Sequence, residues 1–85
     1  MKTFEYEVKD ALGLHARPAA LLAKEAKKYG SWIMVSNGIK TAEATQMLQL
    51  MSMGVKKGQR LTVTLEGMDE EEAAEAIGKF IGDNL

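Results

Sequence analysis

Apolar residues recur along this chain with two alternating periods, and in each segment they mark a single face. Phe4, Tyr6 and Val8 alternate with polar neighbours, which is the period of a half-buried strand. From Ala16 the spacing becomes helical, with one inward stripe of Ala19, Leu22, Ala23 and Ala26, and Gly30 ends the helix. A segment with one apolar face must bury it against another element, so the chain is restricted to folds of packed layers.

The rest of the chain repeats this alternation. Short strands are expected at 32–36 and 39–44 around Asn37-Gly38, a pair typical of tight hairpin turns. Thr45 is expected to cap a brief helix that runs to Met53 and stops at Gly54. A fourth strand follows at 61–66. Asp69, with Glu72 three residues later, resembles a capping box that opens the last helix.

The predicted order is β-α-β-β-α-β-α, which favours an α+β fold with a four-stranded, mainly antiparallel sheet covered on one face by three helices. At 85 residues and 46% hydrophobic content, residues 1–85 are expected to form one domain with one core. The absence of cysteine and the single histidine exclude a disulfide scaffold and make a structural zinc site improbable. No apolar run is long enough for a membrane span and no signal peptide is recognisable, so we expect a cytoplasmic protein without membrane insertion.

Charge is distributed unevenly behind a net value of −1. Residues 17–60 hold eight basic and two acidic side chains, whereas residues 61–85 hold seven acidic side chains and one lysine. These segments are either ordinary solvated faces or a basic face that attracts acidic partner proteins. Nucleic acid is a weaker candidate because aromatic residues do not interleave with the basic ones.

Gly13-Leu14-His15-Ala16-Arg17-Pro18 contains the only histidine and the only proline, where an extended segment gives way to a helix. The start of a helix offers unpaired backbone N–H groups and the positive end of the helix dipole, which together favour phosphate. Arg17 adds a charge that can pair with phosphate oxygens, and a neutral imidazole keeps a lone pair for attack on phosphorus. The pattern predicts a phosphate-accepting histidine.

Three stretches carry a resemblance to a known family: Gly13–Ala20, then Met51-Ser52-Met53-Gly54-Val55, and Gly58. They resemble HPr, the histidine-containing phosphocarriers of the bacterial phosphoenolpyruvate-dependent sugar phosphotransferase system, over essentially the whole chain. The resemblance implies an open-faced β-sandwich, a transient phosphohistidine at His15, stabilisation by Arg17, and backbone N–H groups of Ala16 and Arg17 that assist. It also implies enzyme I as phosphoryl donor, the IIA domain of a sugar permease as acceptor, a monomer, and no cofactor or metal.

The second helix has more apolar residues than one buried stripe can use. We expect Leu50 and Met53 to be core, and flexible exposed methionines to suit several partners. In the family this helix and the start of the first helix dock enzyme I and IIA. The expected partner-binding residues are Ala20, Lys24, Lys27, Met47, Leu48 and Met51, beside Arg17.

Gln46 marks a departure from the family pattern, because many HPr proteins have a regulatory serine at that position. No regulatory serine is therefore expected here: Thr45 is interpreted as a helix cap rather than a substitute phosphosite, and Ser52 lies at the other end of the helix. The repression paralogue of the family, which lacks the histidine and keeps the serine, has the opposite pattern.

Three functional hypotheses follow. The first is a phosphocarrier for sugar uptake. The second is a regulatory paralogue, for example in a nitrogen-related branch, whose phosphorylation state controls protein targets. The third is a binding module in which His15 only caps a helix. A self-sufficient enzyme is not expected, because the chain has no nucleotide loop and no acid–base pair beside His15.

Overall fold

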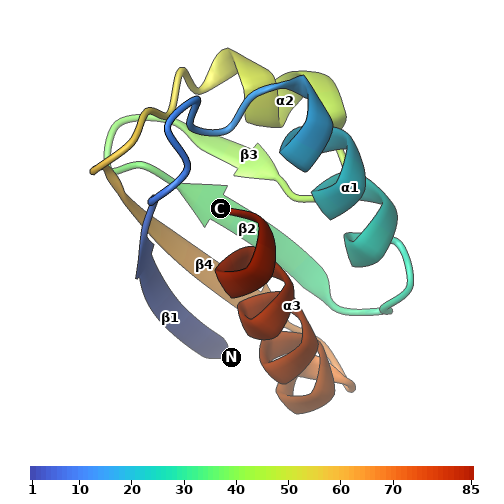
Figure 1. Ribbon diagram of the computed structural model, residues 1–85. Helices are drawn as coiled ribbons and strands as arrows, with labels where there is room; N and C mark the ends of the chain where they lie inside the picture. The colour runs from blue at the N-terminus through green and yellow to red at the C-terminus, as the bar shows by residue number, and fades with distance from the viewer.

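The computed structural model describes residues 1–85 and has the expected order of elements (Figure 1). The strands are β1 (Lys2–Glu7), β2 (Trp32–Ser36), β3 (Thr41–Glu43) and β4 (Arg60–Glu66). The helices are α1 (Ala16–Ala26), α2 (Met47–Ser52) and α3 (Glu70–Asn84). The strands form one antiparallel sheet in the order β1-β4-β2-β3, and the helices cover one of its faces. The predicted α+β, open-faced architecture is confirmed.

Strand register decides which side chains meet the helices. Phe4 lies opposite Val63, and Val63 lies opposite Val35 on the next strand, so these inward positions form a continuous apolar row. Because side chains alternate between the two faces, their neighbours in each strand point to the open face. The largest fully buried side chains come from β2, β4, the three helices and the residue after β1: Leu22, Leu50, Leu61, Leu65, Ile77, Ile81, Val8, Val35 and Val63.

The hairpin between β2 and β3 differs from the expectation of a strand over 39–44. Only Thr41–Glu43 pair with β2, and Ile39 is 91% exposed. The Asn37 side chain explains the difference, because its Oδ1 accepts the backbone N–H groups of Ile39 and Lys40. Those donors are used inside the turn, so the ladder begins later.

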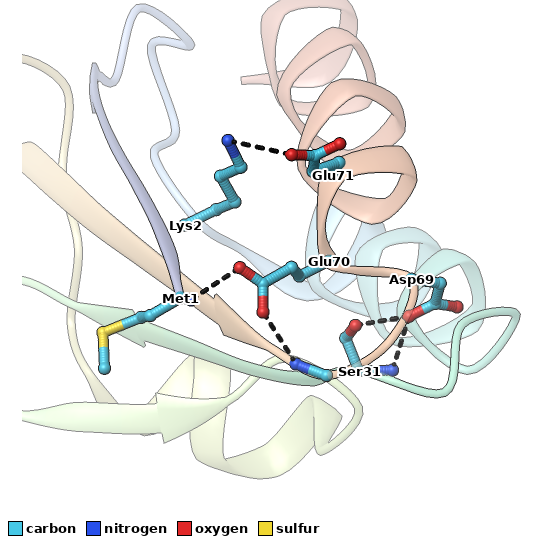
Figure 2. Close-up of polar contacts among 7 residues, drawn as sticks. Met1, Lys2, Ser31, Asp69, Glu70 and Glu71 are labelled. Carbon is cyan, nitrogen blue, oxygen red and sulfur yellow. Dashed lines mark hydrogen bonds and ion pairs between the residues drawn. The ribbon is translucent and has the colours of Figure 1, made fainter.

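Asp69 occupies the N-cap position of α3, but the expected capping box with Glu72 is wrong. The Asp69 side chain makes no capping bond to its own helix. Its carboxylate instead accepts the Ser31 hydroxyl and the Ser31 N–H, the latter at 2.9 Å (Figure 2). It also accepts the Gly30 N–H at 2.9 Å. These hydrogen bonds, the Ser31 hydroxyl first, lower the pKa of Asp69 below its ordinary value. The carboxylate therefore ties the start of α3 to the entry of β2.

Glu70 makes a second set of contacts beside Asp69. Its Oε2 lies 2.6 Å from the Met1 ammonium group, and its Oε1 accepts the Gly67 N–H at 3.2 Å. Both contacts favour the carboxylate, so the pKa of Glu70 is also lowered. Lys2 and Glu71 form a further ion pair of 3.5 Å nearby (Figure 2). This end of the molecule thus joins β1 to the first turn of α3.

Candidate functional site

His15 stands at the N-cap of α1, as the sequence predicts, with extended backbone at φ −94° and ψ −171°. The loop before it is closed by Asp10, whose side chain accepts the Leu12 N–H at 2.8 Å and whose carbonyl accepts the Gly13 N–H at 3.0 Å. The backbone N–H of Asp10 in turn donates to the Leu85 backbone oxygen at 2.7 Å. The end of α3 therefore anchors the loop that carries His15.

Gly13 fits this loop for two separate reasons. Its φ is +67°, a left-handed backbone conformation that residues other than glycine adopt only at a cost in free energy. A Cβ at this position would lie 2.2 Å from the Val55 carbonyl oxygen and 2.8 Å from the Lys56 Cα. That close approach lets the next residue, Leu14, donate its N–H to the same carbonyl at 3.1 Å. The His15 loop is thereby seated on the segment that follows α2.

The first turn of α1 leaves two donors free beside the imidazole. The backbone N–H groups of Ala16 and Arg17 have no acceptor within the protein, and Pro18 has no N–H at all. The His15 side chain forms no capping hydrogen bond either, and it is 35% exposed. An imidazole ring and two unpaired donors at the positive end of the helix dipole thus face the solvent together.

The imidazole ring of His15 has a carboxylate near one of its two nitrogens. Nε2 lies 3.9 Å from Asp10 Oδ1. This distance is longer than a hydrogen bond, so the Asp10 carboxylate contributes a nearby negative charge on that side of the ring.

A pocket of about 300 Å³ lies between the start of α1 and the end of α3. Arg17 is exposed there and takes part in no ion pair, so its guanidinium is free to meet an anion. The full lining is Asp10, Leu12, His15, Arg17, Pro18, Leu21, Asp83 and Asn84. The site consequently mixes one cation with two carboxylates.

Sequence reasoning missed several of these neighbours. Asp83 is 68 positions away from His15 along the chain, and only the packing of α3 against α1 brings it into the pocket. Leu12 and Leu21 are 72% and 38% exposed beside the histidine, and no local pattern places them there. Asp10 could have been suspected from its place in the loop that precedes the motif. Of the two interpretations of the charge distribution, a uniformly basic face around His15 is not what this pocket shows, because Asp10 and Asp83 line it together with Arg17.

The expected docking residues differ in how far their side chains are exposed. Leu48 is 79% exposed and Met51 37% exposed on α2, whereas Met47 is half-buried and packs against the core. Leu50 and Met53 are buried as expected. On α1, which packs beside α2, Lys24 and Lys27 are exposed and Ala20 is half-buried.

The start of α2 differs from the prediction by one residue. Gln46, not Thr45, holds the N-cap position, and no side chain caps the helix. The Gln46 N–H donates to the Glu43 carbonyl at 3.0 Å, which completes a turn before the helix can begin. Thr45 is therefore not the helix cap, and the residue at the N-cap has no hydroxyl.

The structure meets neither the requirements of a metal site nor those of a membrane-spanning helix. No group of three or more histidine or acidic side chains is placed to hold a metal ion. None of the three helices has both the length and the apolar character of a membrane-crossing segment.

Comparison with known proteins gives consistent results. Residues 2–83 match the family described as PTS HPr component phosphorylation site. The chain is 42% identical to the phosphocarrier protein HPr of Mycoplasma pneumoniae over 78 residues, which cover 91% of this chain and 89% of that protein. It is also 42% identical to the HPr-like protein Crh of Halalkalibacterium halodurans, over 91% of this chain and 92% of the relative. The crystal structure of HPr from Thermoanaerobacter tengcongensis superposes with a TM-score of 0.91 at 40% identity, covering 99% of this chain and 94% of that one.

Proposed function

Because the chain belongs to the HPr family of phosphocarriers of the phosphotransferase system, we propose that His15 accepts a phosphoryl group from phosphorylated enzyme I. The carrier then passes the group to the IIA domain of a sugar permease. The observation that carries this proposal is the exposed, uncapped imidazole beside the two unpaired N–H groups of Ala16 and Arg17. A histidine that served only as a helix cap would have its side chain bonded to the helix.

The proposed transfer step is a nucleophilic displacement at phosphorus. The Nδ1 lone pair of His15 forms the new N–P bond while the bond between phosphorus and the donor breaks, and its electron pair leaves with the donor. The phosphoryl group arrives with roughly two negative charges. The N–H groups of Ala16 and Arg17, the dipole of α1 and the Arg17 guanidinium stabilise that charge.

The carboxylates of Asp10 and Asp83 repel the negative charge of the phosphoryl group, and this repulsion suits a carrier. A site that bound the phosphoryl group too tightly would not release it to the next protein. Asp10 also lies near Nε2, where a proton makes the imidazole a better leaving group in the second transfer. We therefore propose a relay protein that is a substrate and donor, not a catalyst, and that acts in the cytoplasm without a cofactor.

Docking of both partners is proposed on the exposed part of α2 and the neighbouring face of α1. Leu48 and Met51 supply apolar contact area, and Lys24, Lys27 and Arg17 supply positive charge beside it. Leu48→Asp should slow phosphorylation at low carrier concentration, because a buried charge in the complex raises the KM for enzyme I. The control is Ile39→Asp, since Ile39 is equally apolar and 91% exposed in the β2–β3 turn. Equal slowing in both variants would contradict this docking surface.

A regulatory branch remains the second candidate because of Gln46. The N-cap of α2 has no hydroxyl to phosphorylate, so control through a serine at that position is not available to this chain. A carrier without the serine either serves transport alone or signals through His15 itself. Phosphoryl transfer from the loaded carrier to a purified sugar IIA domain supports transport, and transfer only to a IIA domain of a regulatory branch supports the second candidate.

The first experiment measures intact mass at mildly alkaline pH after incubation with enzyme I, magnesium and phosphoenolpyruvate. We expect one added phosphate, its loss on acidification, and no addition in His15→Ala. Arg17→Ala should slow the reaction by roughly tenfold or more, because it removes a charged contact to the transferring group. Lys79→Ala, which removes an exposed α3 lysine without an ion pair, should leave the rate unchanged. Absence of phosphate with a competent enzyme I refutes the proposal.

A further inference from the structure

The open face of the sheet carries a pair of apolar side chains that no helix covers. Strand alternation turns Ile33 and Val35 of β2 into the core and leaves Trp32 and Met34 on the other face. Trp32 is 55% exposed and Met34 is half-buried. Met34 pairs with both neighbouring strands, whereas Trp32 begins β2 and lies opposite the last residue of β4, so the pair runs from one end of the sheet toward its interior.

Two carboxylates without cationic partners flank this pair. Glu43 of β3 lies opposite Met34, and its Oε1 accepts the Trp32 indole N–H at 3.2 Å. Glu66 of β4 lies opposite Trp32 in the register. Neither carboxylate takes part in an ion pair, whereas Glu5 on the same face is paired with an arginine at 3.2 Å.

An exposed indole beside uncompensated carboxylates has the chemistry of a cation site. A cation over the face of tryptophan is attracted by the ring, and the carboxylates add ionic hydrogen bonds. Arginine fits better than lysine, because its planar group can stack on the indole and meet a carboxylate with two N–H groups. We propose that Trp32, Met34, Glu43 and Glu66, called here the Trp32 patch, dock an arginine-bearing segment of a partner protein.

The Trp32 patch is separate from the phosphorylation site. α1 lies on the helical side of the sheet (Figure 1). Strand alternation turns the side chains of the patch to the uncovered side. Its four residues include none of those proposed to dock enzyme I or IIA. The inference therefore does not rest on the proposed function, and His15→Ala should bind at the patch as well as the unaltered protein does.

Fluorescence can test the patch directly, because Trp32 is the only tryptophan of the chain. The probe is a blocked glycine–arginine peptide, with the same peptide containing citrulline as the uncharged control. We expect a saturable change in Trp32 emission with the arginine peptide and none with the citrulline peptide. Glu66→Gln should weaken the apparent affinity by about fivefold or more, since it removes one of the two carboxylates.

Glu75→Gln is the matched variant, because Glu75 is an exposed α3 residue without an ion pair and its loss changes the net charge equally. Its affinity should stay within about twofold of the unaltered protein. Equal weakening in both variants would show attraction to net charge alone and would overturn the proposal. An equal response to citrulline, or no saturable response, would also overturn it. So would a fluorescence change that follows protein concentration without peptide, which would instead indicate association of two copies.

Discussion

Gly13→Ala should destabilise the protein by about 2–6 kcal/mol, because a conformational penalty and a steric penalty, which includes a weakened hydrogen bond, coincide at this position. An alanine at φ +67° costs about 1–2 kcal/mol in the left-handed region. Its Cβ would also lie 2.2 Å from the Val55 carbonyl oxygen, so backbone must move, which typically costs about 1–3 kcal/mol. That movement weakens the 3.1 Å hydrogen bond from the Leu14 N–H to the same oxygen, worth about 1 kcal/mol.

Gly54→Ala separates the two penalties. Gly54 has φ +66°, almost the same backbone conformation, but nothing lies within 4 Å of its added Cβ. Only the conformational penalty of about 1–2 kcal/mol applies there. The difference between the two variants therefore measures the contact of the His15 loop with Val55.

Urea unfolding at neutral pH, followed by circular dichroism, gives both free energies of unfolding. Where Gly13→Ala still folds, phosphorylation by enzyme I should also be slower, because the loop that positions His15 has shifted. Gly54→Ala reports the phosphorylation rate with an undisturbed loop. Equal destabilisation of the two variants would refute the argument that close packing, and not only backbone conformation, requires glycine at position 13.

Two further predictions concern α3. Asp69→Asn should destabilise the protein at neutral pH, because the native pKa of Asp69 is lowered by hydrogen bonds from Ser31 and Gly30. That contribution is present above the unfolded pKa of about 4 and is lost as pH falls through the native value, so urea midpoints of the two proteins should converge in acid. A difference that stays constant with pH would contradict this assignment. Gly78→Ala should stabilise the protein by about 0.5–1 kcal/mol and raise Tm by a few degrees, because its Cβ would meet Phe4 at an ordinary 3.9 Å. A lower Tm would show that α3 has no room for the methyl group.

Regular elements were predictable where a long run of residues repeats one period. The start of α1 at Ala16 and the paired alternation of β1 and β4 follow from side-chain spacing, which depends on backbone geometry alone. Short elements were less predictable. β3 and α2 contain three and six residues, so a single side chain such as that of Asn37 can move their boundaries.

Polar side chains were the least predictable, because several partners compete for each of them. Asp69 sits at the N-cap as its local sequence indicates, yet its carboxylate bonds to Gly30 and Ser31. Those groups are nearly forty positions away along the chain, and no local pattern indicates them. The capping box failed for this reason, while the helix it was meant to open was correctly placed.

By itself, the sequence determined the parts of this protein that depend on neighbouring residues. These include the alternation of strands and helices, the histidine at the start of a helix, and the arginine two residues after it. Tertiary structure alone decided what surrounds that histidine. It set the contact of the His15 loop with Val55, the positions of the Asp10 and Asp83 carboxylates, and the exposure of the Leu48 side chain. Local spacing reflects covalent geometry, whereas these contacts exist only after distant elements have buried their apolar faces against one another.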